Sequence, residues 1–99
     1  MSELPKPAEQ PAPLHDVEPG MVLRSTKTNK LLFVTEVGGD KIKGKPITEN
    51  GELEDPNPDR WIQLDLRVAQ SLMVEVKGID VSRLQGYIKG RVEDVSQVN

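Results

Sequence analysis

Three regularly spaced lysines are the residues of this chain whose charges could do chemistry. Lys41, Lys43 and Lys45 occupy every second position of the stretch KIKGKPI. Alternate side chains of a β-strand leave the same face, so this spacing predicts three ammonium groups about 6.6 Å apart. Such a row could follow a phosphate backbone. It also suits an edge strand, where lysines prevent pairing with another chain, and no aromatic residue is interleaved with the lysines to stack on bases.

Charge is distributed unevenly along the sequence. The formal net charge is -3, yet six cations against two anions give residues 20–48 a charge of +4. One cation against five anions gives residues 49–60 a charge of -4. Because charge acts on partners locally, the basic segment predicts a nucleic-acid-binding surface. It comprises the three lysines above together with Arg24, Lys27 and Lys30.

The acidic segment ENGELEDPNPDR, residues 49–60, is predicted to be a long loop because its Asn-Gly, Asp-Pro and Asn-Pro steps break regular structure. Long loops in small domains are often functional. Trp61 follows directly, and an exposed Trp beside an acidic loop is a candidate anchor for a protein partner. We therefore predict a protein interface at Asp59, Arg60 and Trp61; the alternative is that Trp61 caps the end of a small core.

A β-hairpin is predicted to position the lysines. Residues 31–37 are apolar and β-branched, Gly38-Gly39-Asp40 suits a tight turn, and residues 41–47 resume an extended pattern. Residues 21–27 form a plausible first strand, joined by a short turn at residues 28–30, so that a three-stranded meander is expected. A single hairpin buries too little apolar surface in water, so further elements must cover it.

The second half of the chain predicts two more strands. The stretch WIQLDL, residues 61–66, alternates, with Ile62, Leu64 and Leu66 inward and Trp61 on the outer face. Residues 67–70 show no decisive pattern. The period-two repeat of Leu72, Val74 and Val76 favours another strand.

The last part of the chain predicts a short helix and a final strand. Asp80 can cap a helix over residues 81–85, and Gly86 can end it in the left-handed conformation. The chain from 87 to 95 is expected to be extended. Together these elements predict a mainly β fold: a small SH3-like barrel of five to six antiparallel strands with one short helix near residues 80–86.

The first residues have a different composition. Five prolines within residues 1–19 and few large apolar groups predict a disordered, Pro-rich tail over residues 1–18, which leaves residues 19–96 for the barrel domain. A core of about 75 to 80 residues is marginal, so a homodimer is a possible source of further burial.

Composition also argues against several classes of site and location. The chain has no Cys and one His, which makes a thiolate or zinc site improbable, and the prolines of the acidic loop interrupt any calcium loop. We expect no metal and no small-molecule cofactor. The sequence contains no signal-like start and no long apolar run, so a cytoplasmic protein without membrane contact is expected.

Residues 71–90, SLMVEVKGIDVSRLQGYIKG, resemble the closing segment of the PemK/MazF/Kid toxin family and, more distantly, of the CcdB toxins. In that family a strand leads to an Ile-Asp turn, a short helix ending in Arg-Leu and a final strand. Pro46-Ile47-Thr48 is similar to the end of a central strand there, and Pro19-Gly20-Met21-Val22 loosely resembles the opening. The resemblance covers most of residues 19–92 and implies an SH3-like barrel of toxin-antitoxin type.

The sequence departs from this family at the catalytic loop. The ribonucleases of the family carry a long first loop with a catalytic Arg in an Arg-Pro step, whereas here that loop has shrunk to Lys27-Thr28-Asn29-Lys30. Only Thr48 matches a functional position, with Arg24 near the loop. Our leading hypothesis is therefore a non-catalytic barrel that binds nucleic acid or a protein. The alternative is an endoribonuclease toxin with a rearranged site built on Arg24 and Thr48.

Overall fold

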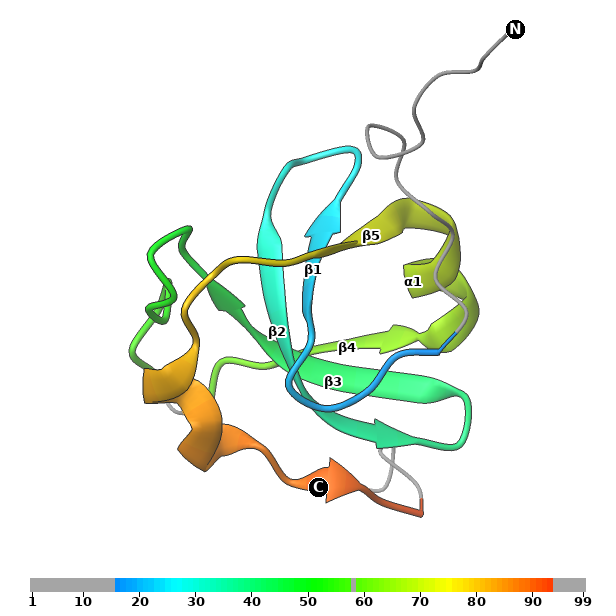
Figure 1. Cartoon of the computed structure of the whole chain (residues 1–99). Coiled ribbons are helices and arrows are strands. Elements are labelled where there is room, and N and C mark those ends of the chain that lie inside the picture. Colours follow the sequence, from blue (N-terminus) through cyan, green and yellow to red (C-terminus); the bar gives the residue numbers. More distant parts are fainter. Residues whose placement is uncertain (1–15, 58, 94–99) are drawn as a thin grey trace, which may run out of the picture.

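The computed structural model describes residues 16–57 and 59–93 of the chain (Figure 1). Its first three strands are β1 (Val22–Ser25), β2 (Leu31–Gly38) and β3 (Lys41–Ile47), which pair as an antiparallel meander. The predicted hairpin and first strand are thus confirmed, although β1 is shorter than expected. The prediction over residues 1–15 lies outside the described residues.

The following elements are β4 (Ile62–Asp65), α1 (Leu66–Leu72) and β5 (Met73–Val76), then the 3-10 helix η2 (Ser82–Tyr87) and β6 (Gly90–Arg91). The strands expected near 61–66 and 72–76 and the short helix near 80–86 are confirmed. The helix α1 was not predicted: Leu72 ends it instead of opening a strand. Gly86 lies inside η2 and does not end it; the positive φ in this region is that of Gly90, at 91°.

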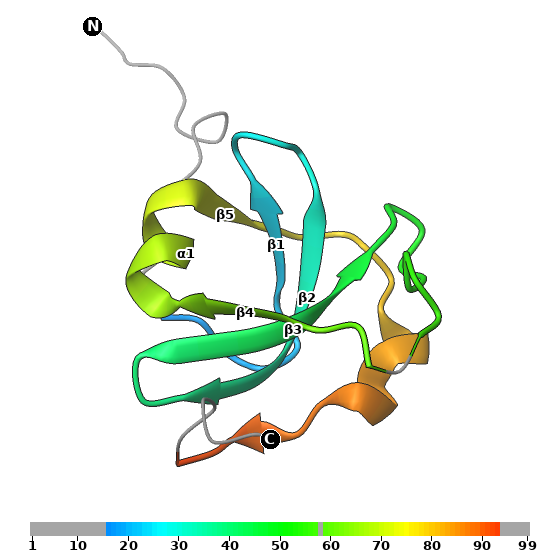
Figure 2. The same ribbon diagram turned by 180° about the vertical axis from the view of Figure 1, so that it is seen from behind.

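The strands form one rolled sheet in the order β4-β3-β2-β1-β5, with β6 paired to β2. The predicted small, mainly β barrel is therefore present, with one difference in direction: β6 runs parallel to β2 beyond the point where β1 ends. In the described part of the chain β4 and β5 are the two margins of the sheet and do not pair. The helix α1 connects them at one end of the gap (Figure 2).

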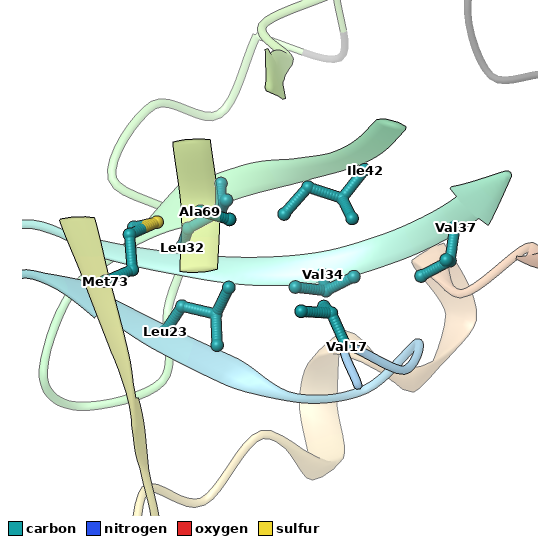
Figure 3. Packing of buried hydrophobic residues seen from close by; sticks show 8 residues of the cluster. All are labelled: Val17, Leu23, Leu32, Val34, Val37, Ile42, Ala69 and Met73. Atoms are coloured by element: carbon teal, nitrogen blue, oxygen red, sulfur yellow. The ribbon is translucent and has the colours of Figure 1, made fainter. Parts of the chain in front are cut away.

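β2 is buried along its whole length because both of its faces are covered. One face belongs to the interior of the barrel, where Leu32 and Val34 pack with Leu23, Ile42 and other apolar residues. Ala69 brings α1 onto this cluster, and Met73 follows it at the start of β5 (Figure 3). Inward-pointing side chains and one short helix thus make the main core.

The opposite face of β2 carries Leu31 and Phe33, which pack with Leu84 of η2. Asp80 fixes the start of this helical turn: its Oδ1 accepts hydrogen bonds from the backbone N–H of Ser82 at 3.0 Å and from the Ser82 hydroxyl at 2.8 Å. These hydrogen bonds hold the pKa of the Asp80 carboxyl below its ordinary value. The C-terminal segment therefore forms a second layer over the outside of the sheet.

The folded unit begins earlier than expected. Val17, which the composition assigned to the tail, is 3% exposed and belongs to the main core. Glu18 Oε2 lies 3.7 Å from Arg91 Nη2, so the segment before β1 lies next to β6. Neither of the two helical segments in residues 16–57 and 59–93 has the length and apolar character needed to cross a bilayer.

Candidate functional site

The three lysines share one face of β3, as their spacing predicts, but that face is covered. Lys43 is 8% exposed and Lys45 is 1% exposed, while Lys41 is partly exposed. β3 is also an interior strand, hydrogen-bonded to β2 on one side and β4 on the other. The expectations of an open lysine row and of a protected edge strand are therefore both wrong. The lysine side chains are covered by Trp61 and by Tyr87 of η2, which lie far from β3 in sequence.

Lys45 extends between two aromatic rings. Its Nζ is 4.2 Å from the centroid of the Trp61 ring and 5.5 Å from that of Tyr87. The ammonium also donates a hydrogen bond to the backbone carbonyl oxygen of Arg60 at 3.1 Å. Burial lowers the pKa of Lys45 below its ordinary value, and the charges of Asp59 and Asp55 act in the opposite direction. Lys45 thus anchors the end of the acidic loop to the sheet.

The other two lysines face carboxylates. Lys43 Nζ lies 3.8 Å from Glu36 Oε1 and 4.8 Å from the centroid of the Trp61 ring. A β-bulge between Val34 and Glu36 makes this pair, because after it Glu36 stands directly opposite Lys43. Lys41 Nζ lies 2.9 Å from Asp65 Oδ1. The positive charges of this face are therefore offset by neighbouring carboxylates.

Trp61 is on the outer face, as expected, but it is half-buried over the lysines. The ring serves mainly as a lid on Lys43 and Lys45, which matches the alternative that it caps a small core. Of the predicted protein interface, Asp59 acts on Lys45 and Arg60 remains exposed.

The remaining cations lie around the β1–β2 turn. Lys30 Nζ is 3.3 Å from Glu54 Oε2, whereas no hydrogen bond or ion pair joins the side chains of Arg24 and Lys27 to other residues within 16–57 and 59–93. Thr48, the other residue of the alternative catalytic pair, accepts hydrogen bonds from the backbone N–H groups of Asn50 and Glu52. β2 separates Arg24 from Thr48, and the structure shows no contact between them.

A cavity of about 350 Å³ opens between β4, the β1–β2 turn and α1. Ligand pockets typically measure about 300–1,000 Å³, so this one is of the size that accepts a few side chains. Arg60, Lys30 and Glu54 contribute its polar wall. Its apolar lining includes Leu32, Pro46, Ile62, Leu64, Val68 and Leu72.

Sequence reasoning missed this cavity because it missed α1. The signal was present: in residues 60–64 every second residue, Arg60, Ile62 and Leu64, lines the cavity. Val68 and Leu72 also line it, and their spacing of four residues is that of one helix face. The strand period of residues 60–64 and the helix period of Val68 and Leu72 together mark the residues on one side of the cavity.

No group of three or more His, Cys, Asp or Glu side chains suited to a metal ion occurs in the described ranges. The relationship to the PemK/MazF/Kid toxins stays a prediction. No protein-family model, no curated protein and no solved structure matches the chain.

Proposed function

We propose that this protein is a non-catalytic binding module that takes up an extended, apolar segment of a partner protein. The observation that carries the proposal is the apolar cavity beside β4, a strand with a neighbour on one side only within the described chain. Extended peptides commonly add to such strand edges, where backbone hydrogen bonds give affinity and pockets for alternate side chains give specificity.

The hydrogen-bonding pattern of β4 supports this mode. The backbone N–H of Leu66 donates to the carbonyl oxygen of Asp40 at 2.7 Å, and Ile42 stands opposite Leu64 in the same register. In an antiparallel pair, hydrogen-bonded and non-hydrogen-bonded positions alternate, so the N–H and C=O groups of Gln63 point away from β3. Gln63 therefore offers a donor and an acceptor to an added strand, beside the Ile62 and Leu64 side chains that line the cavity.

The charges favour a protein partner over nucleic acid. Lys30, Lys41 and Lys43 each have a carboxylate partner within 4 Å. Lys45 is buried under Trp61 and Tyr87. Of the predicted nucleic-acid surface this leaves Arg24 and Lys27 with neither a carboxylate partner nor a covering ring in the described residues, and two cations give little counterion release. The expected cytoplasmic location and homodimer stay predictions.

The test is an NMR titration of the isotope-labelled full chain with acetyl-Gly-Leu-Val-Leu-Gly-amide. We expect shifts confined to the Gln63 amide and to methyl groups of the cavity, and their loss in Val68→Trp, which fills part of the cavity from α1. Arg67→Trp, on the same helix and outside the cavity lining, is the matched control. Absence of shifts at millimolar peptide, or equal shifts in both variants, would overturn the proposal, as would tighter binding of a single-stranded RNA at low salt.

A further inference from the structure

We infer that the peptide recognised at β4 carries an acidic side chain next to its apolar residues, and that Arg60 binds the carboxylate. This inference rests on the proposed function and names the chemistry of its partner. Three observations support it: the position of Arg60, the hydrogen bonds that hold its backbone, and the charges at the mouth of the cavity. The mouth is the part lined by Arg60, Lys30 and Glu54.

Strand alternation directs Arg60 toward the cavity. Arg60, Ile62 and Leu64 all line it, whereas Trp61 packs on the opposite face over Lys45. Because α1 follows β4 directly and contributes Val68 to the lining, the helix limits the cavity at one end of β4. Arg60 stands at the other end, before the strand begins. A bound chain would leave the cavity past Arg60, so we assign the carboxylate to a side chain and not to a chain terminus.

The backbone of Arg60 is held at two points. Its N–H donates to the carbonyl oxygen of Asn57 at 3.0 Å, and its own carbonyl oxygen accepts the hydrogen bond from Lys45 Nζ at 3.1 Å. The side chain therefore starts from a fixed position at the mouth, which reduces the ordering cost of a contact made there.

The charge balance at the mouth leaves one cation without a carboxylate. Lys30 and Glu54 face each other at 3.3 Å and offset one another. Arg60 has no ion pair or side-chain hydrogen bond with any residue of the described segments. Asp55 and Asp59 of the same loop act on Lys45, on the other face of the strand. A guanidinium matches a carboxylate in a bidentate geometry, and such charge-assisted hydrogen bonds are the stronger ones.

The test compares two blocked peptides that differ in one atom group: acetyl-Gly-Asp-Leu-Val-Leu-Gly-amide and its Asn counterpart. We expect the Asp peptide to bind the full chain about fivefold to tenfold more tightly, with the preference lost in Arg60→Gln and retained in the exposed control Arg67→Gln. The preference should also shrink as salt is raised.

The outcomes separate the two proposals. If both peptides bind at the cavity with equal affinity, or if the Asp preference persists in Arg60→Gln, the inference about Arg60 is wrong while the binding function stands. If neither peptide binds, the proposed function fails together with it. The amide spectra of Arg60→Gln and Arg67→Gln check that both variants keep the fold.

Discussion

Lys45, which its spacing predicts to bind nucleic acid, is buried under Trp61 and Tyr87 in the structure. Lys45 as a whole residue is 1% exposed, so its ammonium group has lost hydration, and aromatic faces and a carbonyl oxygen offset this cost only in part. The lowered pKa of Lys45 has the same origin. The side chain is therefore part of the packing that joins β3, β4 and η2, and its aliphatic stem counts as much as its charge.

The Lys45 ammonium predicts a pH dependence of stability. Its folded pKa lies below the unfolded value of 10.5, so between these two values the unfolded chain binds more protons and stability increases with pH. Below both values the cost of burying the charge is present in full. We expect wild-type protein to gain stability relative to Lys45→Met as pH rises from neutral toward 10.5, measured by urea unfolding.

Lys27→Met is the matched control for this measurement, because Lys27 is exposed in the β1–β2 turn. This variant shows what the loss of one exposed positive charge does to stability across the same pH range. Parallel profiles for wild type and Lys45→Met would show that burial does not perturb this lysine.

At the scale of elements, the acidic loop is docked onto the segment that leads into η2. Gly51 has a φ of 78°, and a Cβ built on it would overlap the carbonyl oxygen of Asp80. Arg83 Nη1 donates a hydrogen bond to Glu52 Oε2 at 2.8 Å next to this contact. The close approach of two backbones, more than the exposed ion pair, ties the loop to the outer layer.

We expect Gly51→Ala to lower the free energy of unfolding by about 2 kcal/mol or more, because it adds both a left-handed alanine and a steric overlap with Asp80. Gly86→Ala is the control: a Cβ at Gly86 meets nothing within 4 Å, and its φ is not positive. Its effect should lie within about 0.5 kcal/mol of zero. Chemical denaturation of both variants gives the comparison, and equal stabilities would contradict the docking.

Elements with a strong local pattern could be predicted from sequence. The hairpin of β2 and β3 and the alternating strand β4 each have turn residues or a period that identifies them. The helix α1 has only seven residues, of which Ala69 is buried, so its apolar face was too narrow to outweigh the alternation that begins at Leu72. A short helix of this kind is stabilised by tertiary packing on the open side of the sheet.

The candidate sites depended on contacts that no local pattern reveals. The burial of Lys43 and Lys45 requires β3 to be an interior strand, and this follows from its pairing with β4, across the long loop. It also requires Tyr87 of η2 to reach the same face. The cavity likewise forms because β4 and β5 do not pair. Spacing alone predicted which side chains share a face, but not which faces are covered.

At the scale of the whole molecule, the domain depends on a few residues before its first strand. Val17 packs into the same cluster as Leu32, Val34 and Ala69 and so joins the chain entry to the barrel interior. In a domain of this size, one buried valine is a sizeable part of the total stability. Residues 16–18 therefore belong to the barrel.

Two truncations test this boundary. A chain that begins at Asp16 should unfold at nearly the same temperature as the full chain, since residues 1–15 have a Pro-rich composition with little apolar surface to bury. A chain that begins at Pro19 loses Val17, whose burial is worth about 1.5–3 kcal/mol. Because each kcal/mol shifts the melting temperature of a domain of this size by about 4–8 °C, this chain should melt several degrees lower.

The full-length variant Val17→Ser is the control. It should lower the melting temperature as well, and it separates the loss of Val17 from the loss of the Glu18–Arg91 pair. Equal melting temperatures for the two truncations would place the start of the folded unit after Glu18.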